Sequence, residues 1–134
     1  MSRLVLKLGP KERVLINGAV IENSDRRSKF TILSSKANIL RLKDAIHPDN
    51  ADTPIKRACY LAQLLLSGEV EAEPTWNRLN GQVHVLAEIF VDEDSSSILS
   101  KAKVAITHRN AYACLKLLRQ ILPLETQLLA LREQ

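Results

Sequence analysis

The side chains best suited to chemistry in this sequence are lysines and arginines, which gather in its first third. Residues 3–43 contain ten Lys and Arg against three acids, a net charge of +7 in a chain whose total is +4. Such polarised charge favours a polyanionic partner. Basic side chains on strands and turns can hold phosphates, and arginine can also hydrogen-bond or stack on unpaired bases. The candidate RNA-binding residues are Arg3, Lys7, Arg26, Arg27, Lys29, Arg41 and Lys43.

A second interpretation of the same charges needs no ligand. Lysine on an edge strand protects a sheet against pairing with another chain. Phe30 is the only aromatic residue of this segment, so the aromatic platforms on which single-stranded RNA stacks are missing. The residues alone leave RNA contact and edge protection equally open.

Other chemistry finds little support in the sequence. It contains no nucleophile elbow, phosphate-binding loop, dinucleotide fingerprint or zinc-protease motif. The three histidines lie far apart, and the acidic run at 92–94 lacks the alternating spacing and the glycine of a calcium loop. Cys59 and Cys114 lack C-x-x-C spacing and are expected to be buried, reduced thiols. We therefore predict a protein that is not an enzyme, without catalytic residues, metal or cofactor.

The elements that must position the basic residues are predicted to be five short strands. Apolar runs at 4–8, 13–16, 19–22, 29–33 and 39–42 are separated by turn residues. Asn17-Gly18 between two of these runs predicts a hairpin with a type I′ turn. The result would be an antiparallel meander or small barrel, with Arg41 and Lys43 on one face of the last strand. Several strands are apolar on both faces, so helices or a second copy must cover one face.

The rest of the sequence predicts helices. Thr53-Pro54 is typical of a helix start, and apolar stripes at helical spacing follow it. We therefore predict an α+β fold with a basic β module at 1–46 and a helical region of about four helices at 47–134, either as separate units or as one continuous domain. The longest stripe comprises Trp76, Leu79, Val83, Leu86 and Phe90, and a tail with Leu124, Leu128 and Leu131 is compatible with a further helix.

No apolar run is long enough to cross a membrane, and the N-terminus lacks the apolar core of a signal peptide. The expected location is therefore cytoplasmic, without membrane association.

Three stretches resemble the FlbT family, which regulates flagellar biosynthesis in bacteria: LVLKLGPKERVLINGAVIEN, TILSSKANILRLKDAIHPDNADTPIKR and CYLAQLLLSG. The resemblance is dense up to residue 68 and looser beyond it. It implies a post-transcriptional regulator that binds the 5′ untranslated region of flagellin mRNA, represses translation and promotes mRNA decay, although some members favour flagellin production. The family pattern includes no catalytic residues.

The β module alone is similar to translational repressors of the CsrA type. That similarity implies a homodimer that contacts an mRNA leader through its first and last strands, here residues 3–7 and 41–43. The competing expectation is an adaptor or chaperone-like protein in flagellin synthesis and export. It would bind flagellin or another flagellar regulatory protein through its helices and affect RNA only indirectly.

Overall fold

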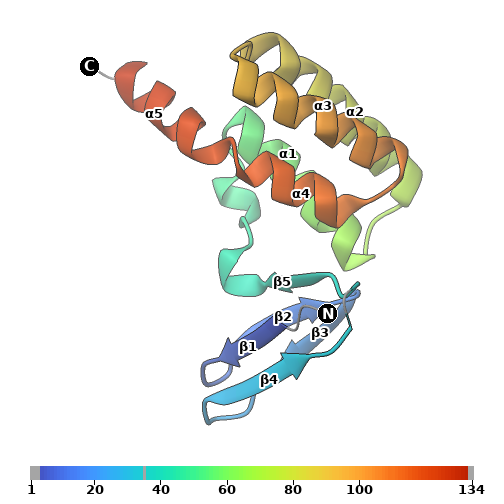
Figure 1. Cartoon of the computed structure of the whole chain (residues 1–134), viewed down its shortest axis with the longest axis vertical. Helices are drawn as coiled ribbons and strands as arrows, with labels where there is room; N and C mark the ends of the chain where they lie inside the picture. The colour runs from blue at the N-terminus through green and yellow to red at the C-terminus, as the bar shows by residue number, and fades with distance from the viewer. Residues whose placement is uncertain (1–3, 35, 133–134) are drawn as a thin grey trace. The chain divides into compact units, whose positions relative to one another are not determined.

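The computed structural model describes residues 4–34 and 36–132 of the chain. It divides into two compact units, Met1–Ala45 and Ile46–Gln134 (Figure 1). The strands all lie in the first unit and the five α-helices in the second. This confirms the predicted α+β fold, with a small β module followed by helices.

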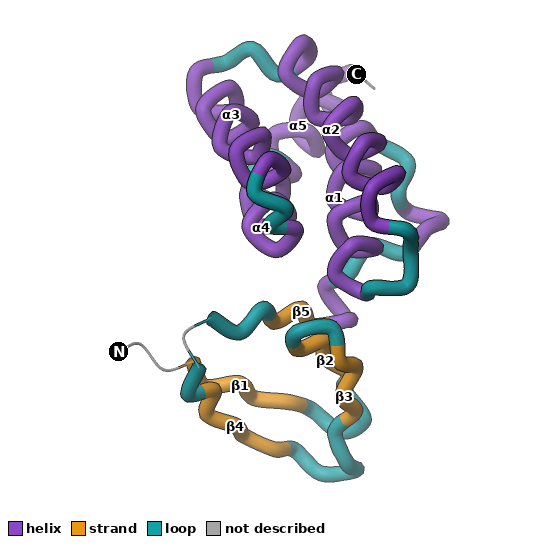
Figure 2. Tube along the Cα trace, turned by 90° about the vertical axis from the view of Figure 1, so that its right-hand side faces the viewer, coloured by secondary structure: helices purple, strands orange, loops and turns teal. Residues whose placement is uncertain are grey.

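The first unit, which we call the strand unit, contains two antiparallel sheets (Figure 2). Strand β1 (Leu4–Leu8) pairs with β4 (Ser28–Ile32), and the order of the second sheet is β3 (Ala19–Glu22), β2 (Arg13–Ile16), β5 (Ile39–Arg41). Only β2 and β3 are both consecutive and paired, so the expected meander or small barrel is wrong. Pairing between distant segments replaces it.

The β2–β3 hairpin confirms the turn prediction. Asn17 and Gly18 both have positive φ, at 48° and 86°, and Ile16 lies opposite Ala19. A type I′ turn requires positive φ at both central positions, which asparagine and glycine tolerate.

The last strand is shorter than the sequence suggested. β5 ends at Arg41, and Leu42–Asp44 forms the 3-10 turn η1, closed by a 3.1 Å bond from the Ala45 amide to the Leu42 carbonyl. The expectation that Arg41 and Lys43 alternate on one strand face is therefore wrong.

The β1–β4 sheet has one apolar and one basic face, because side chains alternate along a strand. Leu6 lies opposite Phe30, whereas Lys7 lies opposite Lys29. Leu6 and Leu8 are buried in a cluster with Val14. Lys7 and Lys29 lie on the opposite face of this sheet.

The second unit, which we call the helical unit, begins with the 3-10 turn η2 (Pro48–Asn50). Its α-helices are α1 (Pro54–Ser67), α2 (Ala72–Ile89), α3 (Glu93–Thr107), α4 (Ala111–Arg119) and α5 (Leu122–Arg132). Thr53 accepts a bond from the Lys56 amide and caps α1, while Gly68 ends that helix at φ 73°. The N-cap of α3 is Asp92, whose side chain accepts a 3.0 Å bond from the Ser95 amide.

The apolar stripes predicted from helical spacing form the core of this unit. All five residues of the longest stripe, on α2 and its C-cap, are buried. Cys59 on α1 and Cys114 on α4 are buried and reduced, and burial raises the pKa of both thiols to about 12. They are therefore protonated at neutral pH and poorly reactive.

The C-terminal tail is helical and makes a fifth α-helix, one more than the approximate count of four. Pro123 lies in its first turn, where a missing amide costs no helical hydrogen bond. Buried Glu125 on α5 accepts bonds from the Thr53 hydroxyl and, at 2.9 Å, from the Ile55 amide. This carboxylate joins α5 to the start of α1. Within the described residues, no helix has the length and apolar character needed to span a bilayer.

Candidate nucleic-acid interface

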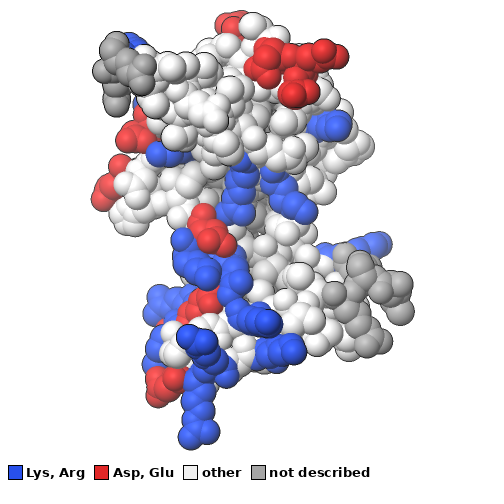
Figure 3. All heavy atoms as spheres, turned by 60° about the vertical axis from the view of Figure 1, so that its left-hand side comes forward, with Lys and Arg blue, Asp and Glu red and all other residues white. Residues whose placement is uncertain are grey.

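A basic pocket of about 480 Å³ lies on the strand unit. Its lining comprises Lys7 and Leu8 from β1, Gly9, Pro10 and Glu12 from the following turn, Arg27, Ser28 and Lys29 at the start of β4, and Arg41 and Lys43. Five of the ten lining residues are basic and one is acidic, which makes the pocket suited to an anion. Figure 3 shows lysine and arginine side chains gathered over this unit.

The strand register places two like charges directly opposite each other in this pocket. Lys7 on β1 pairs with Lys29 on β4, and both side chains are exposed. Like charges at directly opposed positions destabilise a sheet. An anion between the two ammonium groups would remove that repulsion.

Arg27 extends the same row, because it lies two residues before Lys29 and just outside β4. Lys43 completes the group from η1. Within the described part of the chain, none of the four side chains forms an ion pair with a carboxylate; the residues are Lys7, Arg27, Lys29 and Lys43. Their charges are available to a ligand.

Arg41 differs from these four because its guanidinium is engaged inside the protein. Its Nε lies 2.7 Å from Oε2 of Glu12, and its Nη2 lies 3.0 Å from Oε1. Nη2 also donates to the Lys7 carbonyl. This two-pronged pair is partly shielded from water, since the Glu12 side chain is 12% exposed and that of Arg41 is 29% exposed. Arg41 therefore joins β5 to β1 and the β1–β2 turn.

The ionisation of Glu12 reflects these contacts. The hydrogen bond from Arg41 is the main reason why the pKa of Glu12 falls to about 2, and a 3.0 Å bond from the Gly9 amide adds to it. Glu12 is consequently a carboxylate at any physiological pH. Paired with Arg41, it adds no net negative charge to the pocket.

Buried Asn23 holds together the two loops that border the pocket. Its Nδ2 donates to the carbonyls of Gly9 at 2.8 Å and Arg26 at 2.9 Å, with a longer contact of 3.4 Å to Leu8. The backbone amide of Asn23 donates to the Glu12 carbonyl at 2.9 Å. One side chain thus fixes the β1–β2 turn beside the segment that carries Arg27.

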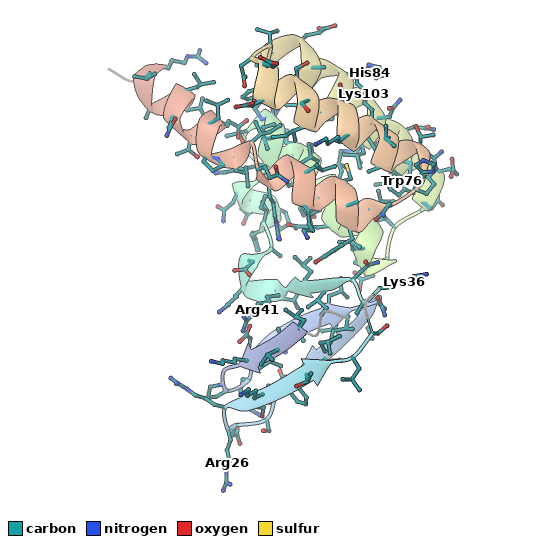
Figure 4. The ribbon with its side chains drawn as sticks, viewed as in Figure 1. Arg26, Lys36, Arg41, Trp76, His84 and Lys103 are labelled. Atoms are coloured by element: carbon teal, nitrogen blue, oxygen red, sulfur yellow. The ribbon has the colours of Figure 1, made fainter. Side chains whose placement is uncertain are left out.

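The structure brings together five of the seven residues predicted from sequence. Lys7, Arg27, Lys29, Arg41 and Lys43 all line the basic pocket. Arg26 does not line it, and Figure 4 shows its side chain extending outward from the β3–β4 loop. Arg3 lies outside the described residues.

Sequence reasoning missed Glu12 and Asn23, which organise the pocket without supplying positive charge. The signal for Glu12 was its position as one of three acids in a strongly basic segment. No pattern pointed to Asn23, since asparagine in a loop is ordinarily a turn residue.

The described residues contain no group of three or more His, Cys, Asp or Glu side chains that could hold a metal ion. His47 accepts a 3.2 Å bond from the Asp49 amide and so caps η2, while His84 and His108 are exposed. The five basic side chains of the pocket support anion binding.

Comparison with known proteins places the chain in a family. The model of the family described as flagellar protein FlbT matches residues 4–129. This chain belongs to the FlbT family. The match spans both units, so the family resemblance seen in the sequence is confirmed along almost the whole chain.

Named relatives agree with this assignment. The flagellum biosynthesis repressor protein FlbT of Caulobacter vibrioides is 35% identical over 128 residues, which cover 92% of this chain and 87% of the relative. Probable flagellum biosynthesis repressor proteins FlbT of another Caulobacter species and of Allorhizobium ampelinum are 29% and 28% identical, covering 92% and 96% of this chain and 94% and 85% of the relatives. No solved structure shows significant similarity.

Proposed function

We propose that this chain regulates flagellin synthesis by binding the 5′ untranslated region of flagellin mRNA through the basic pocket, repressing translation and promoting mRNA decay. Its family membership supports a regulatory role in flagellar synthesis, because the relatives are named repressors of flagellum biosynthesis. Since mRNA is translated in the cytoplasm, the protein would act there. Repression is the sign that the relatives' names favour.

The observation that supports the RNA proposal is a pair of lysines, Lys7 and Lys29, that lie directly opposite each other and form no ion pair in the described part of the chain. They line a pocket that also contains Arg27 and Lys43. These four cations, none of which forms an ion pair in the described residues, would hold consecutive phosphates of one strand. Phosphate contacts give affinity and position, whereas base edges give sequence preference. Aromatic side chains do not line the pocket, so the contacts would be mainly with phosphate and sugar. Occupation of the leader near the ribosome site would block initiation.

An electrophoretic mobility shift with purified protein tests the proposal, using the flagellin leader RNA against a scrambled RNA at physiological salt. Lys7→Gln with Lys29→Gln should weaken leader binding by about 15-fold, because each of the two lost phosphate contacts removes roughly a factor of four at this salt concentration. Replacing both lysines also removes the repulsion between them, so the variant should remain folded.

The matched control is Lys36→Gln with Lys103→Gln. It lowers the net charge by the same amount and leaves every residue that lines the basic pocket unchanged. Figure 4 shows Lys36 at the other end of β5 from Arg41, and Lys103 lies on α3. This control should bind within about twofold of the wild type, as expected of charges away from the contacts. Equal losses in both double variants would show that the pocket is not the site.

The second candidate function is a protein-interaction or chaperone-like adaptor in flagellin synthesis and export. The observation in its favour is a set of exposed leucines on α5, at positions 128, 129 and 131. Under this alternative, the leader RNA would not shift even at low salt, and flagellin or another flagellar regulatory protein would co-purify instead. RNA effects in cells would then require that partner.

A further inference from the structure

Helix α2 presents an apolar stripe on its outward face, away from the core residues of the same helix. Gly81, Val85 and Ile89 recur every four residues on this face. Val85 is 48% exposed and Ile89 is 52% exposed. Side chains four residues apart share one face of a helix, so the stripe is continuous over more than two turns. About half of each of these two side chains is therefore open to solvent.

A groove of about 550 Å³ runs beside this stripe, between α1 and α2. Figure 2 shows the two helices side by side. Tyr60 and Leu64 of α1 form one wall, and Gly81 and Val85 of α2 belong to the other. Two arginines also line the groove, Arg57 and Arg78, and no acidic residue does.

Gly81 is the feature least explained by the folding of this chain alone. Glycine inside a helix costs stability relative to alanine, because it loses more backbone freedom. A Cβ built at Gly81 would meet no atom within 4 Å, so no neighbour in the described structure requires the glycine. The missing side chain leaves a hole in the stripe, open to another molecule.

Charge is distributed unevenly along the stripe. Its N-terminal end has Arg78, with Arg57 across the groove. Its C-terminal end has Glu88, followed by the exposed turn with Asp92, Glu93 and Asp94. In the described residues, neither Arg78 nor Glu88 forms an ion pair. The stripe therefore has one basic and one acidic end.

We infer that the outward face of α2 is a self-association surface, on which α2 of a second copy packs antiparallel about a two-fold axis at Val85. In this register, a residue that lies a given number of positions before Val85 in one copy faces the residue that lies the same number of positions after Val85 in the other copy. Ile89 of one copy then enters the hole at Gly81 of the other, and Arg78 meets the acidic turn beginning at Asp92. Each contact occurs twice, as two-fold symmetry requires.

The register favours a second copy over an unrelated partner because the surface complements itself in both shape and charge. The hole and the isoleucine that fits it lie equally far from Val85, and so do the basic and acidic ends. Complementary charge fixes register and orientation at such interfaces. Arg57, Tyr60 and Leu64 add contacts from α1, so that two helices of each copy take part. The inference does not depend on RNA binding.

Disulfide trapping tests the position of the axis. Val85→Cys places a thiol beside its own symmetry mate, and mild oxidation should convert most of the protein to a covalent dimer. The natural cysteines, Cys59 and Cys114, are buried and do not compete. The matched control is Val104→Cys, since Val104 on α3 is 56% exposed but lies off the stripe. It should crosslink at least tenfold more slowly at the same concentration.

Mixed crosslinking tests the register. A mixture of Gly81→Cys and Ile89→Cys proteins should form a heterodimer faster than either protein forms a homodimer, because the two positions face each other only between copies. Mass measured by light scattering adds an independent readout. The wild type should change from 15.0 kDa to twice that mass as its concentration rises through about 1–100 µM, the range expected for a small interface.

Two substitutions should then keep the protein monomeric across this range. Gly81→Leu fills the hole and also improves helix propensity, so a loss of dimer cannot be attributed to unfolding. Ile89→Arg removes the side chain that enters the hole. A wild type that stays monomeric, or Val85→Cys that crosslinks no faster than Val104→Cys, would overturn the inference. So would a dimer that survives both substitutions but dissociates on Val20→Lys, which would place the interface on β3.

Discussion

The salt dependence of RNA binding is the most direct test of how many charges in the basic pocket act on phosphate. Each neutralised phosphate of a single strand contributes about −0.7 to the slope of log affinity against log salt concentration. Four cations that are free of carboxylates, Lys7, Arg27, Lys29 and Lys43, therefore give an expected slope of about −2.8. Between 50 and 200 mM salt, affinity should fall about 50-fold.

Removal of two of these charges should change the slope by a predictable amount. Lys7→Gln with Lys29→Gln leaves two contacts, so the slope should fall to about −1.4. Glu12→Gln with Arg41→Gln removes a neutral pair and should leave the slope at the wild-type value, even if affinity changes. Fluorescence anisotropy with a labelled leader RNA, titrated at four or more salt concentrations, measures all three slopes.

A wild-type slope close to zero would exclude binding through phosphate, since phosphate contacts cannot be independent of salt. A slope that stays near about −2.8 in the lysine double variant would exclude the basic pocket as the site, because the contacts would then lie elsewhere. A drop in slope for the Glu12 and Arg41 double variant would show that Arg41 leaves Glu12 and contacts RNA itself.

Three further predictions concern the groups that shape the two units. Because the pKa of Glu12 is depressed in the folded state, its carboxylate stabilises the protein above the ordinary pKa of about 4.5. This stabilisation is lost as the pH falls from about 4.5 to about 2. Glu12→Gln should therefore flatten this part of a curve of urea midpoint against pH. Asn23→Ala leaves two partly buried carbonyls without their donor and should cost about 1–3 kcal/mol in urea unfolding. Asn38→Ala, at an exposed side chain, should cost under about 0.5 kcal/mol. Glu125→Ala removes the carboxylate that accepts bonds from the Thr53 hydroxyl and the Ile55 amide at the start of α1. It should lower the free energy of unfolding by about 1–2 kcal/mol in thermal unfolding, and Glu125→Gln should lower it less.

The sequence predicted most of what depends on neighbouring residues. Asn17-Gly18 determines a hairpin locally, and the buried stripe from Trp76 to Phe90 follows from helical spacing alone. Even the cluster of basic residues was found, because charge is visible in composition. These features need no knowledge of distant parts of the chain.

What the sequence did not predict depends on pairing between distant segments. β1 pairs with β4, and β2 pairs with β5 as well as with its hairpin partner β3; no local signal selects β4 or β5. Glu12 and Arg41 are separated by 29 residues, so their pairing follows from that topology.

The opposed lysines of β1 and β4 also have a consequence for how long the protein persists in a cell. Repulsion between Lys7 and Lys29 makes this strand pair less stable when the pocket is empty than when it holds an anion. A ligand at a hundred times its dissociation constant would stabilise the folded state by about 2.7 kcal/mol. Proteases cleave the transiently opened form, so the empty protein would be degraded faster than the occupied one. The amount of this protein in the cell would then rise with the amount of mRNA available to occupy its pocket.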